Sequence, residues 1–165
     1  MLRGYALNQR IDRIENKLYE HDQKFELLIK TALPPHEGIF FDGQIYDAYE
    51  KVSSFIKEAK FSIILIDNYI DDTVLTLLTK RKKGVKTTIY TQKISKQLAL
   101  DIQKHNAQYD PVDVKVFAKS HDRFLIIDEK IIYHIGASLK DLGKKWFAFS
   151  KIDLNPEIIL NELNN

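Results

Sequence analysis

The sequence predicts an α/β fold, a mixed β-sheet with helices on both faces, preceded by a long N-terminal helix of the coiled-coil type. From about residue 38 onward, short apolar segments rich in β-branched residues alternate with amphipathic segments, which is typical of repeated βα units. The first thirty-odd residues instead keep one apolar stripe at helical spacing. With 165 residues and 44% hydrophobic content, the chain can bury one core. We therefore expect an N-terminal helical dimerisation arm over residues 1–35 and one α/β domain over residues 36–165.

The predicted arm carries an unbroken heptad seam. Its members are separated alternately by four and three residues: Leu7, Ile11, Ile14, Leu18, His21, Phe25 and Leu28. Mixed charges cover the other faces of the helix, and Pro34 with Pro35 cannot extend it. A coiled coil that joins two copies of the chain is one interpretation, and a long helix packed on its own domain is the alternative.

The remaining elements follow in order after the prolines. Strands are expected over residues 38–42, 61–66, 85–90, 112–118, 123–127, 131–135 and 146–150, and helices over residues 44–59, 71–79, 95–106 and 156–163. A single apolar stripe runs along residues 44–59, and Asp71 is suited to cap the helix that it begins. The apolar run over residues 61–66 suits a strand covered on both sides.

Composition excludes several classes of site. The chain has no cysteine, so it can form neither disulfides nor thiolate metal sites. Neither a His-x3-His pair nor a cluster of carboxylates occurs, and we expect no metal and no cofactor. No window reaches the eighteen apolar residues that crossing a bilayer requires, and the first residues lack a secretory apolar stretch. We expect a soluble, cytoplasmic protein with no membrane partner.

Residues 120–128 carry the side chains best suited to chemistry. His121, Arg123 and Asp128 form the pattern His-x-Arg-x4-Asp around a short apolar run. Alternation along a strand predicts that His121 and Arg123 project from the same face. An imidazole can attack phosphorus or transfer a proton, and a guanidinium holds phosphate oxygens. Asp128 falls on the other face at the strand end, where a structural turn or an ion pair is the expected role.

This pattern resembles the signature of the phospholipase D superfamily, His-x-Lys-x4-Asp followed by a Gly-Ser turn. The follower here is Gly136-Ala137-Ser138, and the whole pattern covers about a fifth of the chain. The resemblance implies a phospholipase D-like fold, a metal-free site, and a catalytic set of His121, Arg123, Asp128 and Ser138.

The chain departs from that signature in several places. Arginine stands where the family has lysine, one residue interrupts the Gly-Ser pair, and Asp141 stands near the place where the family usually has Asn. Residues 146–150 contain no carboxylate, although members usually carry a downstream acid that orients the histidine.

The mechanism that the resemblance implies needs two histidines. One attacks phosphorus to give a phosphohistidine, and the other protonates the leaving oxygen. This chain carries one such motif, so the second would come from another copy across a two-fold axis, which implies a homodimer. The alternative for His121 is a hydrogen-bonded structural residue at the start of a strand.

Basic residues indicate where a phosphate or nucleic acid could bind, although the net charge is only +2. Besides Arg123, the candidates are Lys140, Lys144 and Lys145, which follow the motif, and the cluster Lys80, Arg81, Lys82 and Lys83. The turn after the motif is expected to bring Lys144 and Lys145 near His121. The alternative for the cluster is a solvated helix end. Trp146 is a candidate for stacking on a base, and burial in the core is the favoured alternative.

A second, shorter resemblance lies at the N-terminus. Residues 2–8, Leu-Arg-Gly-Tyr-Ala-Leu-Asn, look like the joint after the DNA-binding domain in RhuM-like and KilA-N-type phage-related proteins. This resemblance implies that the chain is a C-terminal fragment.

Taken together, these patterns leave two functions. The favoured one is a homodimeric phosphodiesterase or nuclease acting on nucleic acid, and the alternative is a catalytically inactive module that dimerises a phage-type regulator and binds nucleic acid.

Overall fold

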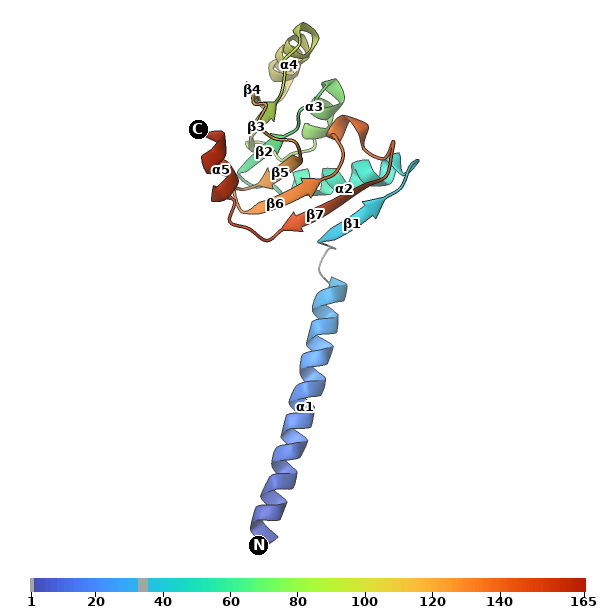
Figure 1. The fold of residues 1–165 in the computed structure, drawn as a ribbon, viewed down its shortest axis with the longest axis vertical. Helices are drawn as coiled ribbons and strands as arrows, with labels where there is room; N and C mark the ends of the chain where they lie inside the picture. The colour runs from blue at the N-terminus through green and yellow to red at the C-terminus, as the bar shows by residue number, and fades with distance from the viewer. Residues whose placement is uncertain (1, 33–35) are drawn as a thin grey trace. The chain divides into compact units, whose positions relative to one another are not determined.

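The computed structural model describes residues 2–32 and 36–165, which fall into two units, Met1–His36 and Glu37–Asn165. In the first unit, α1 (Leu2–Ala32) is a single helix of 31 residues (Figure 1). The predicted helix is therefore confirmed, whereas Pro34 and Pro35, which were expected to end it, lie outside the described residues. All seven seam side chains are exposed. Their packing against a second chain stays a prediction.

The second unit contains one seven-stranded sheet (Figure 1). Its strands are β1 (Glu37–Phe40), β2 (Ser62–Ile66), β3 (Lys86–Thr91), β4 (Val112–Val116), β5 (Arg123–Ile127), β6 (Ile131–Ile135) and β7 (Phe147–Ile152). The spatial order is β1-β7-β6-β5-β2-β3-β4. Strands β2, β3 and β4 pair in parallel, and every other neighbouring pair is antiparallel. The predicted mixed α/β sheet is confirmed.

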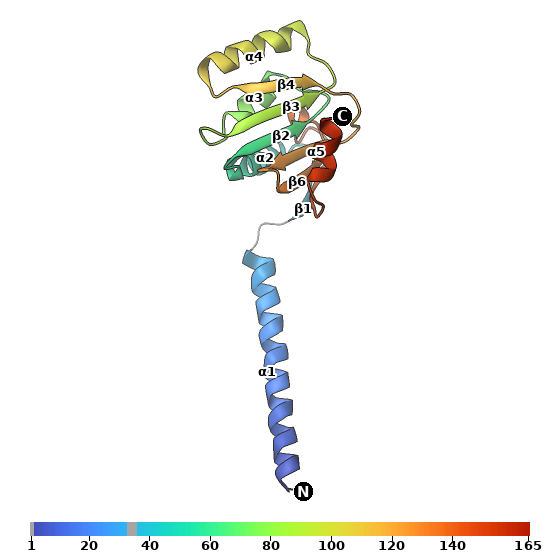
Figure 2. The same ribbon diagram turned by 90° about the vertical axis from the view of Figure 1, so that its left-hand side faces the viewer.

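Helices cover the two faces of the sheet unequally. The helices of this unit are α2 (Ile45–Glu58), α3 (Asp72–Leu78), α4 (Lys96–Gln108) and α5 (Glu157–Leu163). Apolar side chains of α2 and α3 share one core with the sheet, and α4 packs beside α3. The opposite face carries α5 alone (Figure 2). The side chains of Ile159 and Leu163 on α5 line a pocket with Ile66 and Phe124. The predicted helices on both faces are present, but the second face has a single short one.

The core follows from strand alternation. Alternate side chains of the central strands, such as Leu65 on β2 and Leu125 on β5, are fully buried beneath the helices. Helix α2 presents its apolar stripe to them, and its Phe55 stacks on Tyr133 of β6 with ring centroids 3.8 Å apart. The capping prediction is also confirmed, because the carboxylate of Asp71 accepts the backbone N–H of Thr73 at the start of α3.

Strand register gives the sheet two distinct ends. Arg123 pairs with Ile135, so the start of β5, the end of β6 and the start of β7 lie together, and the end of β2 joins them. We call this the Arg123 end. The start of β2 and β3 and the end of β5 lie at the other end, which we call the Asp128 end. Residues 80–85 lead directly into β3 and therefore belong to the Asp128 end.

Candidate functional site

A pocket of about 520 Å³ opens at the Arg123 end of the sheet. Its lining comes from the loop after β2, the start of β5 and the connection between β6 and β7: Tyr69, Arg123, Gly136, Ala137, Ser138, Asp141, Lys144, Lys145 and Trp146. The volume is in the range of about 300–1,000 Å³ that is usual for ligand sites. Convergence of three separate segments on one cavity is typical of a binding site placed on a rigid sheet.

Arg123 gives this pocket its charge. Its guanidinium is a planar cation, and its buried Nε has no hydrogen-bond partner among the described residues. Lys145 is exposed on the rim, and the Nζ of Lys144 lies 2.9 Å from Asp141. The lining therefore holds three cationic side chains against one carboxylate. The excess positive charge suits an anion with several oxygens, such as a phosphate.

A buried carboxylate, Asp67, holds the pocket together from behind. It follows β2 directly and is fully buried. Its oxygens accept the backbone N–H of Leu139 at 2.8 Å and of Tyr69 at 3.1 Å. The hydroxyl of Ser138 lies 3.0 Å from both oxygens and 2.7 Å from the carbonyl of Tyr69. Asp67 thus ties the loop after β6 to the loop after β2, and both of these loops line the pocket.

The surroundings of Asp67 shift the pKa of its carboxyl group. Burial raises the pKa of its carboxyl group above the ordinary value, while the N–H groups of Leu139 and Tyr69, the Ser138 hydroxyl and the charge of Arg123 act to lower it. The Ser138 hydroxyl has one proton for three neighbouring oxygens.

Sequence reasoning missed Asp67. One signal for it was available, because a lone carboxylate follows the apolar run of β2 at the end of the strand where functional groups gather in α/β sheets.

Aromatic side chains form two parts of the pocket wall. Trp146 is 68% exposed, so the favoured expectation that it is buried in the core is wrong. The indole Nε1 donates to the carboxylate of Asp42 at 2.9 Å, and the ring meets Phe41 nearly at a right angle. Tyr69 is 53% exposed, and the Nζ of Lys140 lies 6.0 Å from its ring centroid. Lys140 is thereby placed beside a pocket residue, although it does not itself line the cavity.

No family model matches the chain, and no curated protein matches it. Among solved structures it is similar to NucT from Helicobacter pylori, at 18% identity over 78% of this chain and 91% of that chain, with a TM-score of 0.54. It is also similar to the archaeal chromatin protein TrmBL2, at 17% identity over 96% of this chain and 64% of that chain, with a TM-score of 0.51.

The chain shares its fold with these two proteins. This is consistent with the phospholipase D-like fold that the His-x-Arg-x4-Asp pattern predicted. The likeness concerns the fold alone, so the role of each side chain has to be judged from its own surroundings.

His121 lies at the Arg123 end but does not line the pocket. Strand β5 begins at Arg123, so the expectation that both residues lie on one strand is wrong. The chain bends there because Asn68 donates to the carbonyl of Ser120 at 2.7 Å and the Ser120 hydroxyl donates to the carbonyl of Asp122 at 2.8 Å. His121 is exposed. Among the described residues, no carboxylate forms an ion pair with it.

Asp128 holds backbone groups at the Asp128 end of the sheet, and the catalytic role that the resemblance implied stays a prediction. Its carboxylate accepts the backbone N–H groups of Lys60, Phe61 and Ser62 at 2.7–3.1 Å. Burial by itself would raise the pKa of Asp128, but these N–H groups and the charge of Lys130 lower it below the ordinary value. At about 3.3 Å per residue, the five residues of β5 place it roughly 16 Å from Arg123.

Two of the predicted candidates do line the Arg123 pocket together with Arg123 itself: Lys144 and Lys145. A third, Ser138, lines it too, but the Ser138 side chain is buried and bonded to Asp67. Its hydroxyl therefore shapes the pocket and is not presented to a ligand.

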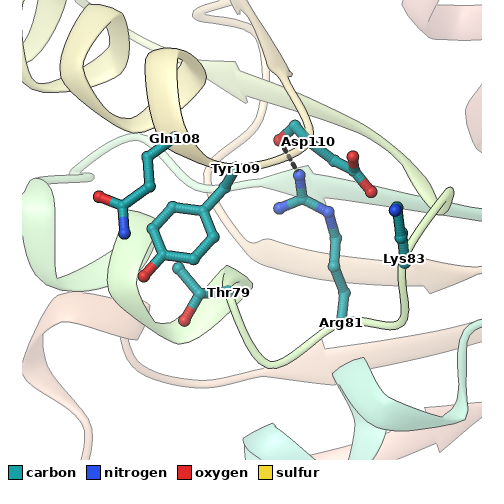
Figure 3. A pocket seen from close by; sticks show the side chains of 6 residues that line it. All are labelled: Thr79, Arg81, Lys83, Gln108, Tyr109 and Asp110. Atoms are coloured by element: carbon teal, nitrogen blue, oxygen red, sulfur yellow. Dashed lines mark hydrogen bonds between the residues drawn. The ribbon is translucent and has the colours of Figure 1, made fainter.

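The cluster of Lys80, Arg81, Lys82 and Lys83 is not part of this site, because it lies at the Asp128 end. Arg81 is buried, and its guanidinium donates to the backbone carbonyl of Leu78. It also donates to the backbone carbonyl of Asp110 (Figure 3). Burial lowers the pKa of Arg81, and the charge of Asp110 opposes that effect. Arg81 thus joins the end of α3 to the turn before β4, and its assignment as a ligand-binding residue stays a prediction. Lys80, Lys82 and Lys83 remain exposed.

The described ranges 2–32 and 36–165 contain neither a metal site nor a membrane-spanning helix. No group of three His, Asp or Glu side chains in these ranges is placed to hold a metal ion. No helix in them is long and apolar enough to cross a bilayer.

Proposed function

We propose that residues 37–165 bind the phosphodiester backbone of nucleic acid in the Arg123 pocket. The observation that carries this proposal is the position of Arg123: a permanently charged fork lines an open cavity beside Lys144 and Lys145, and its Nε has no partner among the described residues. Arginine and lysine contacts to phosphate oxygens supply most of the affinity in nucleic-acid binding, whatever the sequence.

Nucleic acid is the phosphodiester that the solved structures favour. NucT is a nuclease of the phospholipase D family, and TrmBL2 is a chromatin protein with a mode of DNA binding described as novel. Both share the fold with this chain at low identity, so they support the choice of ligand class without assigning any residue.

The test is the anisotropy of a fluorescent oligonucleotide titrated with the full chain. Arg123→Met and Lys145→Ala should each weaken binding, by about tenfold for Arg123, and should reduce its salt dependence. Arg123→Lys, which keeps the charge but loses the planar fork, should fall between the parent and Arg123→Met. Lys82→Ala, at the Asp128 end, is the matched control and should bind like the parent. Equal binding by Arg123→Met and the parent would refute the proposal.

A second candidate function is hydrolysis of the bound phosphodiester, and the exposure of His121 two residues before Arg123 favours it. The reaction would need two chains. The imidazole of one His121 attacks phosphorus, the ester oxygen leaves with a proton from the other His121, and water then cleaves the phosphohistidine. In EDTA, cleavage of a labelled strand should vanish in His121→Ala and persist in His36→Ala. If the chain binds the nucleic acid but never cleaves it, hydrolysis is refuted and binding remains as its function.

Dimerisation through α1 is part of this proposal. The heptad seam from Leu7 to Leu28 is exposed along its whole length, and a second copy of the same helix is the partner whose seam matches it in spacing. A dimer would also bring two Arg123 pockets to one nucleic acid, which raises the affinity above that of either pocket. In the binding-only form, the chain would serve as the C-terminal module of a phage-type regulator whose upstream domain selects the DNA site.

A further inference from the structure

The exposed tryptophan of the Arg123 pocket is the feature that phosphate binding leaves unexplained. Trp146 is 68% exposed, although an indole is among the side chains that gain most from burial. It is nevertheless fixed in place. The Nε1 bond to Asp42 lies in the plane of the ring, at 2.9 Å, and Phe41 packs at 83° to it with ring centroids 4.6 Å apart. A ring that is fixed by these contacts and still 68% exposed keeps ring surface available for a planar partner.

A second aromatic side chain lines the same cavity. Tyr69 comes from the loop after β2, whereas Trp146 comes from the connection between β6 and β7, so the two rings reach the pocket from different segments. Asp67 anchors the Tyr69 segment by accepting the Tyr69 N–H. Lys140 lies 6.0 Å from the Tyr69 ring centroid and adds positive charge beside it. Phosphate-binding cations and stacking surfaces are therefore combined in one pocket.

We infer that this pocket selects single-stranded or unpaired nucleic acid, with Trp146 stacking on a base while Arg123 and Lys145 hold the adjacent phosphate. The inference rests on the proposed phosphodiester binding and names its substrate class. Basic grooves with aromatic platforms are the usual means of binding single strands, since every base has a flat face. Bases inside a duplex already stack on both sides and cannot lie against an indole without being unpaired.

Trp146 is the only tryptophan of the chain, so its fluorescence reports on this event directly. The full chain is titrated with three ligands of equal length: a single strand, the same strand with abasic positions in its centre, and a duplex. The single strand should quench the fluorescence and bind about tenfold more tightly than the abasic strand. The duplex should bind without a comparable quench.

Variants separate stacking from charge. Trp146→Leu should bind the natural and abasic strands equally, and Trp146→Phe should keep part of the difference. Tyr46→Leu is the matched control, because Tyr46 is 72% exposed but lies on α2 outside the pocket lining, and it should discriminate like the parent.

Two other outcomes are each decisive for a different claim, stacking in the first case and phosphate binding in the second. If the abasic strand binds the parent chain as tightly as the natural strand, and Arg123→Met weakens both, then stacking is refuted and phosphate binding stands. If neither strand nor the duplex binds at all, phosphate binding and stacking fail together. The abasic comparison uses the unmodified chain, so it does not depend on how well Trp146→Leu folds.

Discussion

The hydroxyl of Ser138 lies 3.0 Å from both carboxylate oxygens of Asp67, although 71 residues separate the two in sequence. This contact and the N–H of Leu139 fix the loop after β6 against the end of β2. The position of the pocket lining therefore depends on one buried carboxylate that does not itself line the pocket.

Replacing that carboxylate should loosen the pocket. Asp67→Asn leaves one acceptor oxygen and turns an amide N–H₂ toward backbone donors, so we expect a loss of about 1–3 kcal/mol in the free energy of unfolding. Ser138→Ala removes one donor and leaves both N–H bonds of Asp67 in place, so its cost should be smaller, about 0.5–1.5 kcal/mol. Urea unfolding measures both. An Asp67→Asn chain as stable as the parent would show that these bonds do not hold the loops.

Asp128 should contribute to stability in a pH-dependent way. Its pKa is lower in the folded chain than its ordinary value of 3.8, so its stabilisation is fully present above that value and is lost as the pH falls through the folded pKa. The raised pKa of Asp67 acts in the opposite direction, because ionising that buried group costs stability as the pH rises above 3.8.

Asp128→Asn isolates the first effect. Asn tolerates the positive φ of 54° at this position, so the substitution changes the charge with little backbone cost. The difference in urea midpoint between parent and variant should be largest at neutral pH and should shrink below pH 3.8. A difference that grows on acidification would contradict the lowered pKa.

Gly143→Ala should be strongly destabilising. Gly143 has φ of +75°, and a Cβ there would lie 2.5 Å from Cα of Ile45 and 2.6 Å from the carbonyl oxygen of Gln44. Gly84 has nearly the same backbone, φ +84°, with nothing within 4 Å of its Cβ, so Gly84→Ala is the matched control. We expect about 1–2 kcal/mol for the control, and about 1–3 kcal/mol more for Gly143→Ala from the clash. Equal losses of stability in the two variants would show that the loop around Gly143 accommodates a Cβ without an energetic cost.

Arg81→Met should lower stability without changing nucleic-acid affinity. The buried guanidinium joins Leu78 to Asp110, and its loss leaves two backbone carbonyls without these donors, at a cost of about 1.5–3 kcal/mol. Thermal unfolding and oligonucleotide anisotropy on the same sample separate the two effects. A loss of affinity at unchanged stability would support the assignment of Arg81 as a ligand-binding residue.

Charges placed in the α1 seam should dissociate the proposed dimer. Ile14→Glu and Leu18→Glu introduce carboxylates at two seam positions, whereas Lys17→Glu makes the same kind of change outside the seam. Sedimentation of the full chain should give the monomer mass for the seam variant and the dimer mass for the control. A monomeric parent chain would refute the arm as a dimerisation element.

Much of the fold could be predicted from local sequence. Each predicted strand and helix occurs, because alternation, apolar stripes and capping residues such as Asp71 act within a few residues. That Lys144 and Lys145 lie in the same pocket as Arg123 was partly predictable for the same reason, since the turn at residues 136–143 is short. Contacts between distant residues were not. The partners of Asp67 lie 71 or 72 residues downstream, and Asp110, which accepts from Arg81, lies 29 residues further on.

Local bends escaped the sequence reasoning for a related reason. Alternation predicted that His121 lies on the strand with Arg123. The side chain of Asn68, 52 residues before Ser120, instead donates to the carbonyl of Ser120, and β5 begins only at Arg123. Trp146 was assigned to the core on hydrophobicity, and its partner Asp42 lies 104 residues earlier. In both cases a polar group from a neighbouring segment decided the outcome.

The two neighbours of β2 in the sheet lie at different distances along the sequence. Strand β3 follows β2 closely, whereas β5 follows about 60 residues later, after β3 and β4. Until β5 is in place, the apolar strand from Ser62 to Ile66 presents one row of open backbone groups, a template for unwanted association between chains. Proteolysis or truncation between β4 and β5 should therefore produce an insoluble fragment instead of a smaller folded domain.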